Sequence, residues 1–303
     1  MNEKFKKCSI IIRTKNEERW VGACLSAVFE QSYKNFEVII VDNKSTDRTL
    51  EKVSQYPVKE IVTISKYLPG DSLNIGINAS SGDYIVCLSS HCIPTNDKWL
   101  ENLVKALEED EKYAGVYGRQ ESMTFSSAAD KRDLLLVFGL DQKIQIKDSF
   151  FHNANSILRR YLWDDVPFDP KITNIEDRIW GQEMINRGFK IRYEPDASVY
   201  HYHGIHQNGN TERCENVVRI IENMQLKQNG SGNLDATKLN IVAIVPVRGC
   251  DVILNEKSQM FFTIDKALKS KYINKIFVST ESQQTATIAV DLGANAYIRP
   301  ETL

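Results

Sequence analysis

The stretch SIIIRTKNEERWVGACLSAVFEQSYKNFEVIIVDNKSTDRTLE, residues 9–51, decides the fold. An apolar run rich in β-branched residues covers 7–13, and the apolar residues of 16–32 then recur at helical spacing. A second apolar run covers 36–41 and leads into N-cap residues before a helical pattern over 47–55. The stretch therefore predicts strand, helix, strand, helix.

The same alternation continues up to residue 118. Apolar strands that alternate with helices predict a Rossmann-like α/β fold, in which helices cover both faces of a mostly parallel sheet. Ligands of such sheets bind beyond the carboxyl ends of the strands. The expected elements are strands at 60–64, up to His91 and at 114–118, and helices at 71–80 and 97–108.

The pattern loosens after residue 118, and a second segment follows later. QNGSGNLDATK, residues 228–238, has the Gly, Ser and Asn content of a linker. We predict a first domain over 1–228, a linker over 229–238 and a partial second α/β segment over 239–303. Further expected elements are helices at 126–140, 177–187, 212–227, 258–269 and 282–292, a loop at 150–157, and strands at 190–193, 240–247, 273–279 and 294–298.

Composition excludes several classes of protein. With 38 basic and 40 acidic residues, the net charge of -2 provides no electrostatic footprint for nucleic acid. The 6 cysteines form no Cys-x-x-Cys pair, which favours reduced thiols and a cytoplasmic protein. No run reaches the roughly 18 apolar residues of a membrane span, so any membrane contact is expected to be peripheral, at the inner face.

The histidines concentrate in one half of the chain. All 5 lie between His91 and His206, and VYHYHGIH contains His201, His203 and His206. His91 follows an apolar strand in CLSSHCIP, residues 87–94. Several histidines near one crevice favour a metal or phosphate site, and alternation would point His201 and His203 to one face. For His91 alone, packing in the core is the alternative.

Two carboxylate pairs are candidates for chemistry. Asp42, at a strand end, can accept hydrogen bonds from a nucleobase or a ribose, whereas Asp47 fits an acidic helix cap beside Ser45. Glu176 and Asp177 begin a predicted helix. The pair is compatible with two roles, a general base or a solvated helix cap. His-Glu-x-x-His, Walker and nucleophile-elbow motifs are absent from the sequence.

Three ordered blocks resemble the family 2 glycosyltransferases, which have the GT-A fold. They are residues 9–51, YLPGDSLNIGINASSGDYIVCLSSHCIP at 67–94, and IEDRIWGQEMINRGFKIRYEPDASVYHYHG at 175–204. The resemblance covers about residues 7–228. It implies an inverting transfer of a sugar from a nucleotide diphosphate to a hydroxyl, with Asp177 as general base beside Glu176. The donor-side residues it implies are Thr14, Asn16, Glu17, Asp42, Ser45, Asn74 and Ser90.

One departure from the family concerns the metal. Where the family has Asp-x-Asp, this chain has Ser89-Ser90-His91, which resembles the Asp-x-His variant of polypeptide N-acetylgalactosaminyltransferases with its first Asp replaced. The resemblance implies that His91 holds Mn²⁺ or Mg²⁺ with His203 or His201, or contacts the diphosphate without a metal. Imidazole suits Mn²⁺ better than Mg²⁺.

The segment after the linker resembles the amino-terminal part of acylneuraminate cytidylyltransferases, at 241–251, 267–282 and 293–301. Arg248-Gly249 matches that family's phosphate loop, but Cys250-Asp251-Val252 stands where Gly-Ser-Lys is expected. The part that carries that family's metal-binding carboxylate does not follow, so no activity is assigned to the segment.

The leading hypothesis is a glycosyltransferase in surface polysaccharide or glycoconjugate synthesis. Its expected partners are a nucleotide-diphosphate sugar and a glycan, lipid-linked or protein-linked acceptor. A degenerate GT-A module that binds nucleotide sugar or glycan without turnover is one alternative. A cytidylyltransferase that activates a sugar is the other.

Overall fold

The computed structural model describes residues 6–204, 211–229, 239–249, 252–254 and 256–300. The chain divides into two compact units, Met1–Gln225 and Leu226–Leu303. Apart from Asn229, the residues predicted as a linker lie outside the described part. Within the described ranges, no helix combines the length and the apolar character that a membrane span requires.

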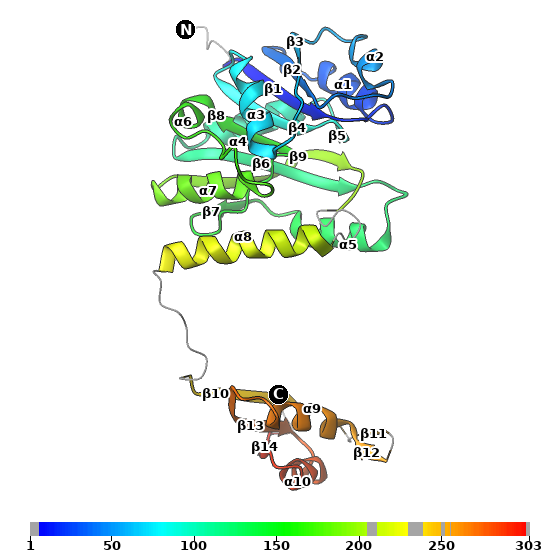
Figure 1. The fold of residues 1–303 in the computed structure, drawn as a ribbon, viewed down its shortest axis with the longest axis vertical. Helices are drawn as coiled ribbons and strands as arrows, with labels where there is room; N and C mark the ends of the chain where they lie inside the picture. Colours follow the sequence, from blue (N-terminus) through cyan, green and yellow to red (C-terminus); the bar gives the residue numbers. More distant parts are fainter. Residues whose placement is uncertain (1–5, 205–210, 230–238, 250–251, 255, 301–303) are drawn as a thin grey trace. The chain divides into compact units, whose positions relative to one another are not determined.

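A mixed, mostly parallel sheet forms the centre of the first unit (Figure 1). Its described strands lie in the order β3-β2-β1-β4-β8-β6-β9-β5, with β7 paired to β9. Neighbours from β3 to β4 are parallel, as are β6 and β9, whereas β8 is antiparallel to β4 and β6. The strands are β1 Cys8–Thr14, β2 Phe36–Asp42, β3 Glu60–Thr63, β4 Tyr84–Ser89, β5 Cys92–Pro94, β6 Tyr113–Ser122, β7 Lys143–Gln145, β8 Asn155–Arg159 and β9 Lys190–His201.

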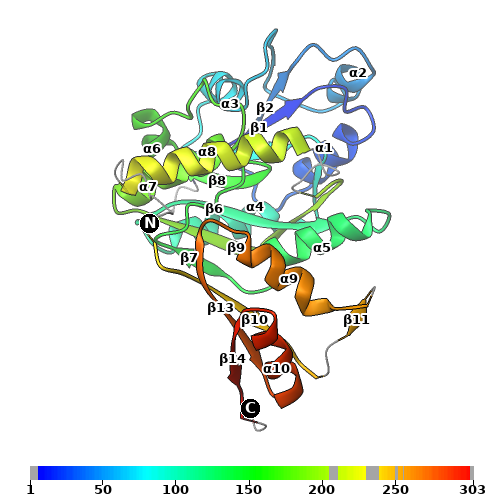
Figure 2. The same ribbon diagram turned by 60° about the horizontal axis from the view of Figure 1, so that its bottom comes forward.

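Helices cover both faces of this sheet (Figure 1, Figure 2). Because side chains alternate along a strand, Ile10 and Ile12 of β1 pack in one core with α1 and α4, while Ile11 packs in the other with α3 and α7. The predicted α/β architecture is therefore confirmed. The helices are α1 Val21–Phe29, α2 Thr49–Val53, α3 Pro69–Asn78, α4 Trp99–Glu108, α5 Ala128–Val137, α6 Arg160–Asp165, α7 Glu176–Asn186 and α8 Thr211–Asn229.

Three expected boundaries were wrong. The predicted loop at 150–157 contains the start of β8, whose Ile157 and Leu158 are fully buried between β4 and β6. The strand expected at 190–193 continues to His201, because it pairs with β6 and then with β5. The strand expected to reach His91 ends at Ser89.

The second unit contains a small parallel sheet in the order β10-β13-β14. Its core includes Met260 and Ile264 of α9, Val278 of β13 and Ala289 of α10. Cys250 and Asp251 lie outside the described residues. The elements are β10 Ile241–Pro246, β11 Ile253–Leu254, β12 Lys257–Ser258, α9 Gln259–Leu268, β13 Ile273–Thr280, α10 Gln283–Asp291 and β14 Asn295–Ile298.

Candidate active site

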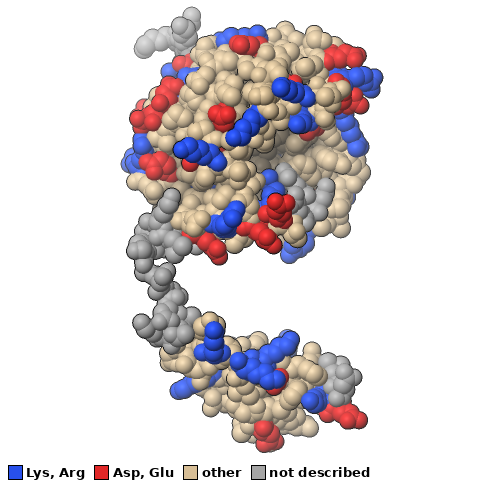
Figure 3. All heavy atoms as spheres, in the orientation of Figure 1, with Lys and Arg blue, Asp and Glu red and all other residues tan. Residues whose placement is uncertain are grey.

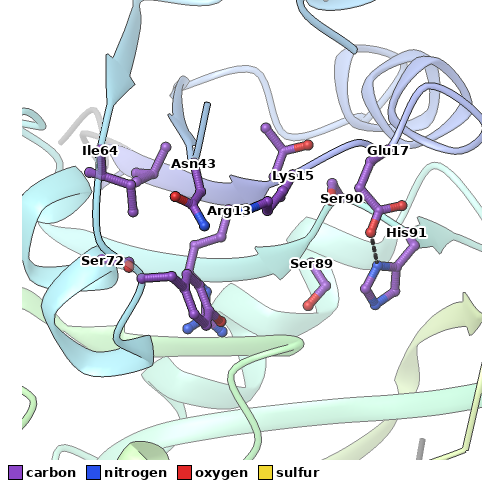
Figure 4. A pocket seen from close by; sticks show the side chains of 12 residues that line it. Arg13, Lys15, Glu17, Asn43, Ile64, Ser72, Ser89, Ser90 and His91 are labelled. Carbon is purple, nitrogen blue, oxygen red and sulfur yellow. Dashed lines mark hydrogen bonds and ion pairs between the residues drawn. The ribbon is translucent and has the colours of Figure 1, made fainter. Parts of the chain in front are cut away.

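A cavity of about 210 Å³ lies at the carboxyl ends of β1, β2 and β4 (Figure 4). The strands are parallel, so the polar residues that follow them gather at one edge of the sheet, as expected for an α/β ligand site. The cavity is lined by Arg13, Thr14, Lys15, Glu17, Val41, Asn43, Ile64, Tyr67, Ser72, Ser89, Ser90 and His91.

Two cations line this cavity, and neither was singled out from the sequence. The Arg13 guanidinium donates to the Pro69 carbonyl at 2.9 Å and lies 3.4 Å from Glu176. It also lies 5.9 Å from the ring centre of Tyr67, an aromatic residue that is 49% exposed. Lys15 is exposed. Cations in a concave site favour an anionic ligand, and their positions on both sides of Thr14 were the signal in the sequence.

Charge elsewhere on the visible face of the first unit is mixed. Lysine and arginine are interspersed with aspartate and glutamate in Figure 3, without a broad region of one sign. This distribution agrees with the net charge of -2. It lacks the basic stripe that is typical of nucleic-acid binding.

The residues after β1 and β2 are tied to each other. Asp42 is 1% exposed, and its carboxylate accepts the Ser45 N–H at 3.0 Å and the Ser45 hydroxyl at 2.5 Å. The Ser45 hydroxyl accepts the Asn16 N–H at 2.9 Å, and the Asn16 side chain accepts the Thr46 N–H at 2.8 Å. These bonds fix the two loops beside the cavity, whose lining residues include Asn43 but not Asp42, Asn16 or Ser45.

The sequence predicted N-cap residues at 45–47, but Ser45 forms no capping bond to α2. Arg48 is the N-cap residue of α2 and forms no side-chain capping bond, whereas the Asp47 carboxylate accepts the N–H of Thr49, the first residue of the helix, at 2.9 Å. Asp47 also accepts the Glu18 N–H at 3.0 Å. The Ser45 hydroxyl instead donates to Asp42 and accepts the Asn16 N–H.

The other donor-side candidates fall into two groups. Thr14 and Ser90 line the cavity, and the buried Thr14 hydroxyl has no hydrogen-bond partner among the described residues. Asn74 is not among the lining residues. Its amide donates to the Phe168 carbonyl at 2.7 Å and accepts from the Trp163 indole at 3.0 Å, so it joins α3 to the segment around α6.

Three histidines form a cluster, and one of them, His91, lines the cavity. His91 follows β4, His201 ends β9, and His203 comes two residues later. One ring nitrogen from each lies within 4.8 Å of the others. The rings of His91 and His201 are stacked with centroids 5.2 Å apart. His206 lies outside the described residues.

Each of these rings keeps a nitrogen available for a ligand. The Nδ1 atom of His91 lies 2.8 Å from a Glu17 carboxylate oxygen (Figure 4), which leaves Nε2 free. His203 Nδ1 lies 3.0 Å from the Gly204 carbonyl, and both nitrogens of the buried His201 lack a hydrogen-bond partner within the described chain. A second ring nitrogen held by a carboxylate or a carbonyl is the usual arrangement of metal-binding histidines.

Electrostatics favour the neutral form of His201 and His203. Burial, together with His91 and His203, holds the pKa of His201 well below its ordinary value. Burial also lowers the pKa of His203. Neutral imidazole is the form that binds metal ions, so His201 and His203 need lose no proton to bind one near neutral pH.

The second carboxylate pair lies buried at the start of α7. Asp177 is 8% exposed, and its oxygens accept the N–H groups of Asn153 at 2.9 Å and of Arg178 at 2.8 Å. Glu176 is 4% exposed and lies 3.4 Å from both the Asn153 amide and Arg13. Arg13 therefore connects this pair to the cavity.

The pKa values of both acids are raised. Burial is the largest cause for each, and the charge of Asp177 adds to it for Glu176. The N–H groups that contact Asp177 act in the opposite direction and stabilise the ionised form. Such an environment makes a carboxylate a stronger proton acceptor than it is in water.

An aromatic cluster beside the histidines was also missed in the sequence. Arg19 lies 4.4 Å from the ring centre of Trp20 and 5.6 Å from those of Phe125 and Tyr202. Trp20 follows β1, Phe125 follows β6, and Tyr202 stands between two of the histidines. The three are far apart in the sequence, which provided no signal for their association.

The family model described as Glycosyl transferase family 2 matches residues 9–166. This range includes the strands β1, β2 and β4 that end at the cavity, as well as His91.

Individual relatives are similar over much of the chain. A dolichyl N-acetyl-glucosaminyl phosphate diacetamido-dideoxy-glucuronosyltransferase of Methanococcus voltae is 27% identical over 64% of this chain and 66% of its own length. The O-antigen rhamnosyltransferase WbaN of Salmonella anatum is 28% identical over the same shares. The chain thus spans just under two thirds of the length of these two curated relatives. An uncharacterised glycosyltransferase of Haemophilus influenzae is 25% identical over 85% of this chain and 86% of its own.

Solved structures share the fold. Residues 1–349 of Staphylococcus aureus TarS in complex with UDP-GlcNAc have a TM-score of 0.53 and 18% identity, covering 67% of this chain and 61% of theirs. A mannosyltransferase of Pyrobaculum calidifontis in complex with GDP-Man and Mn²⁺ has a TM-score of 0.51 and 20% identity, covering 64% and 56%.

Proposed function

Because the chain belongs to glycosyl transferase family 2, we propose that its first unit transfers a sugar, with inversion, from a nucleotide-diphosphate donor to an acceptor hydroxyl. The observation that carries the proposal is the cavity at the ends of β1, β2 and β4, whose lining includes two cations and His91, a member of the histidine cluster. Relatives named for dolichol-linked glycan and O-antigen synthesis support a glycan or lipid-linked acceptor.

The cavity provides groups that complement each part of a nucleotide-diphosphate donor. Arg13 and Lys15 provide positive charge for the diphosphate. The partly exposed ring of Tyr67 offers an apolar face for a nucleobase, and Asn43 and Thr14 offer hydrogen bonds. An indirect role falls to Asp42, Ser45 and Asn16, whose hydrogen bonds fix the loops that follow β1 and β2 beside the donor site. We infer no direct role for Asn74, whose amide is used within the fold.

The histidine cluster fits a divalent metal ion. His91, His201 and His203 would hold it, since each has a free ring nitrogen and the buried nitrogens of His201 have no other partner in the described chain. Two nitrogens bound to one ion at about 2.1 Å lie at most about 4.2 Å apart, so small side-chain movements from the 4.8 Å spacing suffice. When bound, such an ion neutralises charge on the leaving diphosphate.

Glu17 has a positioning role in this proposal. Its carboxylate accepts the Nδ1–H of His91, which fixes the tautomer with Nε2 unprotonated. The preference among metals is for Mn²⁺ over Mg²⁺, because Mg²⁺ favours oxygen ligands. Mn²⁺ is also the ion in the complex of the mannosyltransferase that shares the fold.

Asp177 is the proposed general base. Its buried carboxylate is oriented by two backbone N–H groups and has a raised pKa, two properties that suit a base that removes a proton from an attacking hydroxyl near neutral pH. Glu176 holds Arg13, so it links the position of the base to the donor side. The first compact unit would thus be the transferase domain.

Thermal shifts with nucleotides test donor binding. The purified chain is melted with UDP, dTDP, GDP or CMP, each with Mn²⁺ and with a chelator, because a ligand that binds only the native state raises the melting temperature. We expect a shift with one nucleoside diphosphate that is larger with Mn²⁺. His201→Ala should lose the Mn²⁺-dependent part of the shift.

Tyr200→Ala is the matched control, since Tyr200 precedes His201 in β9 and its side chain is 43% exposed. It should retain the Mn²⁺-dependent shift. No shift with any nucleotide would contradict donor binding and favour a module without turnover. A shift that the chelator does not affect would contradict the metal site but not the donor site.

A further inference from the structure

The outer side of α5 and β7 exposes large aliphatic side chains. Leu135, Leu136, Leu140, Ile144 and Ile146 are each between 56% and 69% exposed, and all lie within twelve consecutive residues. We call this set the α5–β7 surface. Scattered exposed leucines are normal on a soluble domain, but five in one continuous segment indicate an interaction surface.

This segment is anchored to the first unit from its inner side. Leu134 and Phe138 are buried in the core that also contains Tyr117 and Tyr193. Gln145 of β7 is buried and accepts the Tyr117 hydroxyl at 2.6 Å. The buried residues are interspersed along the segment with the exposed aliphatic ones, so the segment is held against the unit while those side chains remain exposed. Helix α5 lies at the periphery of the unit in both views (Figure 1, Figure 2).

Cations accompany the aliphatic residues. Lys131 and Arg132 are exposed one turn before Leu135 and Leu136, and Lys143 and Lys147 flank Ile144 and Ile146. The acids of the same segment are Asp133, which lies 3.6 Å from Arg132, Asp141, and Asp148, which lies 3.3 Å from Arg178, so positive charge exceeds negative charge by one. Positive charge beside protruding aliphatic residues is the combination found in segments that lie at the surface of an anionic membrane.

We propose that the α5–β7 surface docks the protein onto an anionic lipid bilayer, with the aliphatic side chains in the headgroup boundary and the lysines at the phosphates. A symmetric contact between two copies of this chain would set the same patch against itself and bring its cations together. An anionic bilayer complements both the apolar and the charged groups. The inference does not depend on transfer activity.

Co-sedimentation with vesicles tests the proposal. The full chain is mixed with vesicles of phosphatidylcholine alone or with 30 mol% phosphatidylglycerol, a composition of roughly the charge that attracts basic segments. We expect binding to the anionic vesicles. Leu135→Gln/Leu136→Gln should reduce it at least about tenfold, because two leucine side chains leave the apolar boundary.

Two further variants define the surface. Ile61→Gln/Tyr161→Gln removes two apolar side chains that are 39% and 57% exposed in β3 and α6, and it should bind like the unaltered chain. Lys143→Gln/Lys147→Gln should weaken binding to the anionic vesicles and reduce its dependence on salt. Equal vesicle binding by all variants would overturn the proposal.

Sedimentation velocity without lipid distinguishes the competing occupant. We expect a monomer for the unaltered chain and for Leu135→Gln/Leu136→Gln. A dimer that the leucine substitutions dissociate, together with no binding to either type of vesicle, would assign the surface to self-association and overturn lipid docking.

Discussion

Two buried carboxylate sites of the first unit have opposite electrostatics. Glu37 in β2 is 8% exposed, like Asp177, yet it lies 2.5 Å from Lys7 and 2.9 Å from Lys59 and accepts the Ser9 hydroxyl at 2.8 Å. Burial pushes the pKa of Glu37 upward, but the hydrogen bonds from Lys7 and Lys59 outweigh it and lower the pKa to about 2. In contrast, burial dominates at Asp177 and raises its pKa.

The difference separates a carboxylate that stabilises the fold from the carboxylate that we propose as the general base. Glu37 has enough donors to compensate for its desolvation, so its ionisation stabilises the fold. At Asp177 the two backbone N–H groups do not compensate for burial, so its ionisation costs stability. Perturbed carboxylates of this kind are concentrated at reactive sites, which supports the proposed role of Asp177.

The largest expected effect is the loss of transfer activity when Asp177 is replaced. Asp177→Asn should lower the rate of sugar transfer by about 10²–10⁴-fold, the usual contribution of a general base. Affinity for the nucleoside diphosphate should change little, because Asp177 is not among the residues that line the cavity. The rate is measured as release of the nucleoside diphosphate, and affinity by calorimetry.

Glu183→Gln on the same helix is the control, because the Glu183 side chain is 43% exposed and pairs only with Arg187 among the ion pairs of the described residues. It should leave both quantities unchanged. Full activity of Asp177→Asn would remove Asp177 as the base.

A smaller effect, on the stability of the fold, is expected when Glu37 is replaced. Glu37→Gln should lower the free energy of unfolding by about 2 kcal/mol, because Lys7 and Lys59 lose a buried acceptor. The melting temperature of the first unit should fall by about 4–8 °C, with transfer activity retained below the transition. Glu51→Gln, at an exposed position of α2, should melt like the unaltered chain, and an equal fall in both variants would show that the effect is not specific to Glu37.

The smallest effect is a difference in pH dependence, which has opposite signs at the two sites. The pKa of Glu37 is lowered by folding, so its stabilisation is present above the unfolded value of about 4.3 and is lost as pH falls toward 2. The deficit of Glu37→Gln should therefore disappear in acid.

At Asp177 the pKa is raised by folding, so stability is lost relative to Asp177→Asn as pH rises through the raised pKa. The melting temperature of Asp177→Asn should thus increase relative to the unaltered chain between about pH 4 and neutral pH. Parallel melting curves for the two proteins at every pH would contradict the unfavourable ionisation of Asp177.

Much of the fold could be predicted because its strands are apolar runs. β1, β2 and β4 are buried on both faces, which requires continuous apolar sequence and makes such strands easy to recognise. The start of β8 was taken for a loop because polar residues such as Asn153 and Asn155 surround it, and these side chains are satisfied by distant partners. Partners of this kind exist only in the folded chain.

The same limit applies to the candidate site. Clustering of the histidines could be predicted, since VYHYHGIH and CLSSHCIP are distinctive, and the structure brings His91, His201 and His203 together. The contact between Arg13 and Glu176 spans 163 positions and had no local signal. The bonds that join Asp42 to Ser45 depend on loop geometry, so the sequence alone did not distinguish a direct ligand contact from support of the loops.

The most direct test of glycosyl transfer is the stereochemistry of donor cleavage. The full chain, with Mn²⁺, is incubated with UDP-, dTDP- and GDP-sugars, and the anomeric protons are followed by NMR with water as the acceptor. The account predicts that one donor loses its sugar and that the first signal to appear is the anomer opposite in configuration to the donor. A first product of unchanged configuration, or no cleavage of any donor, would contradict it.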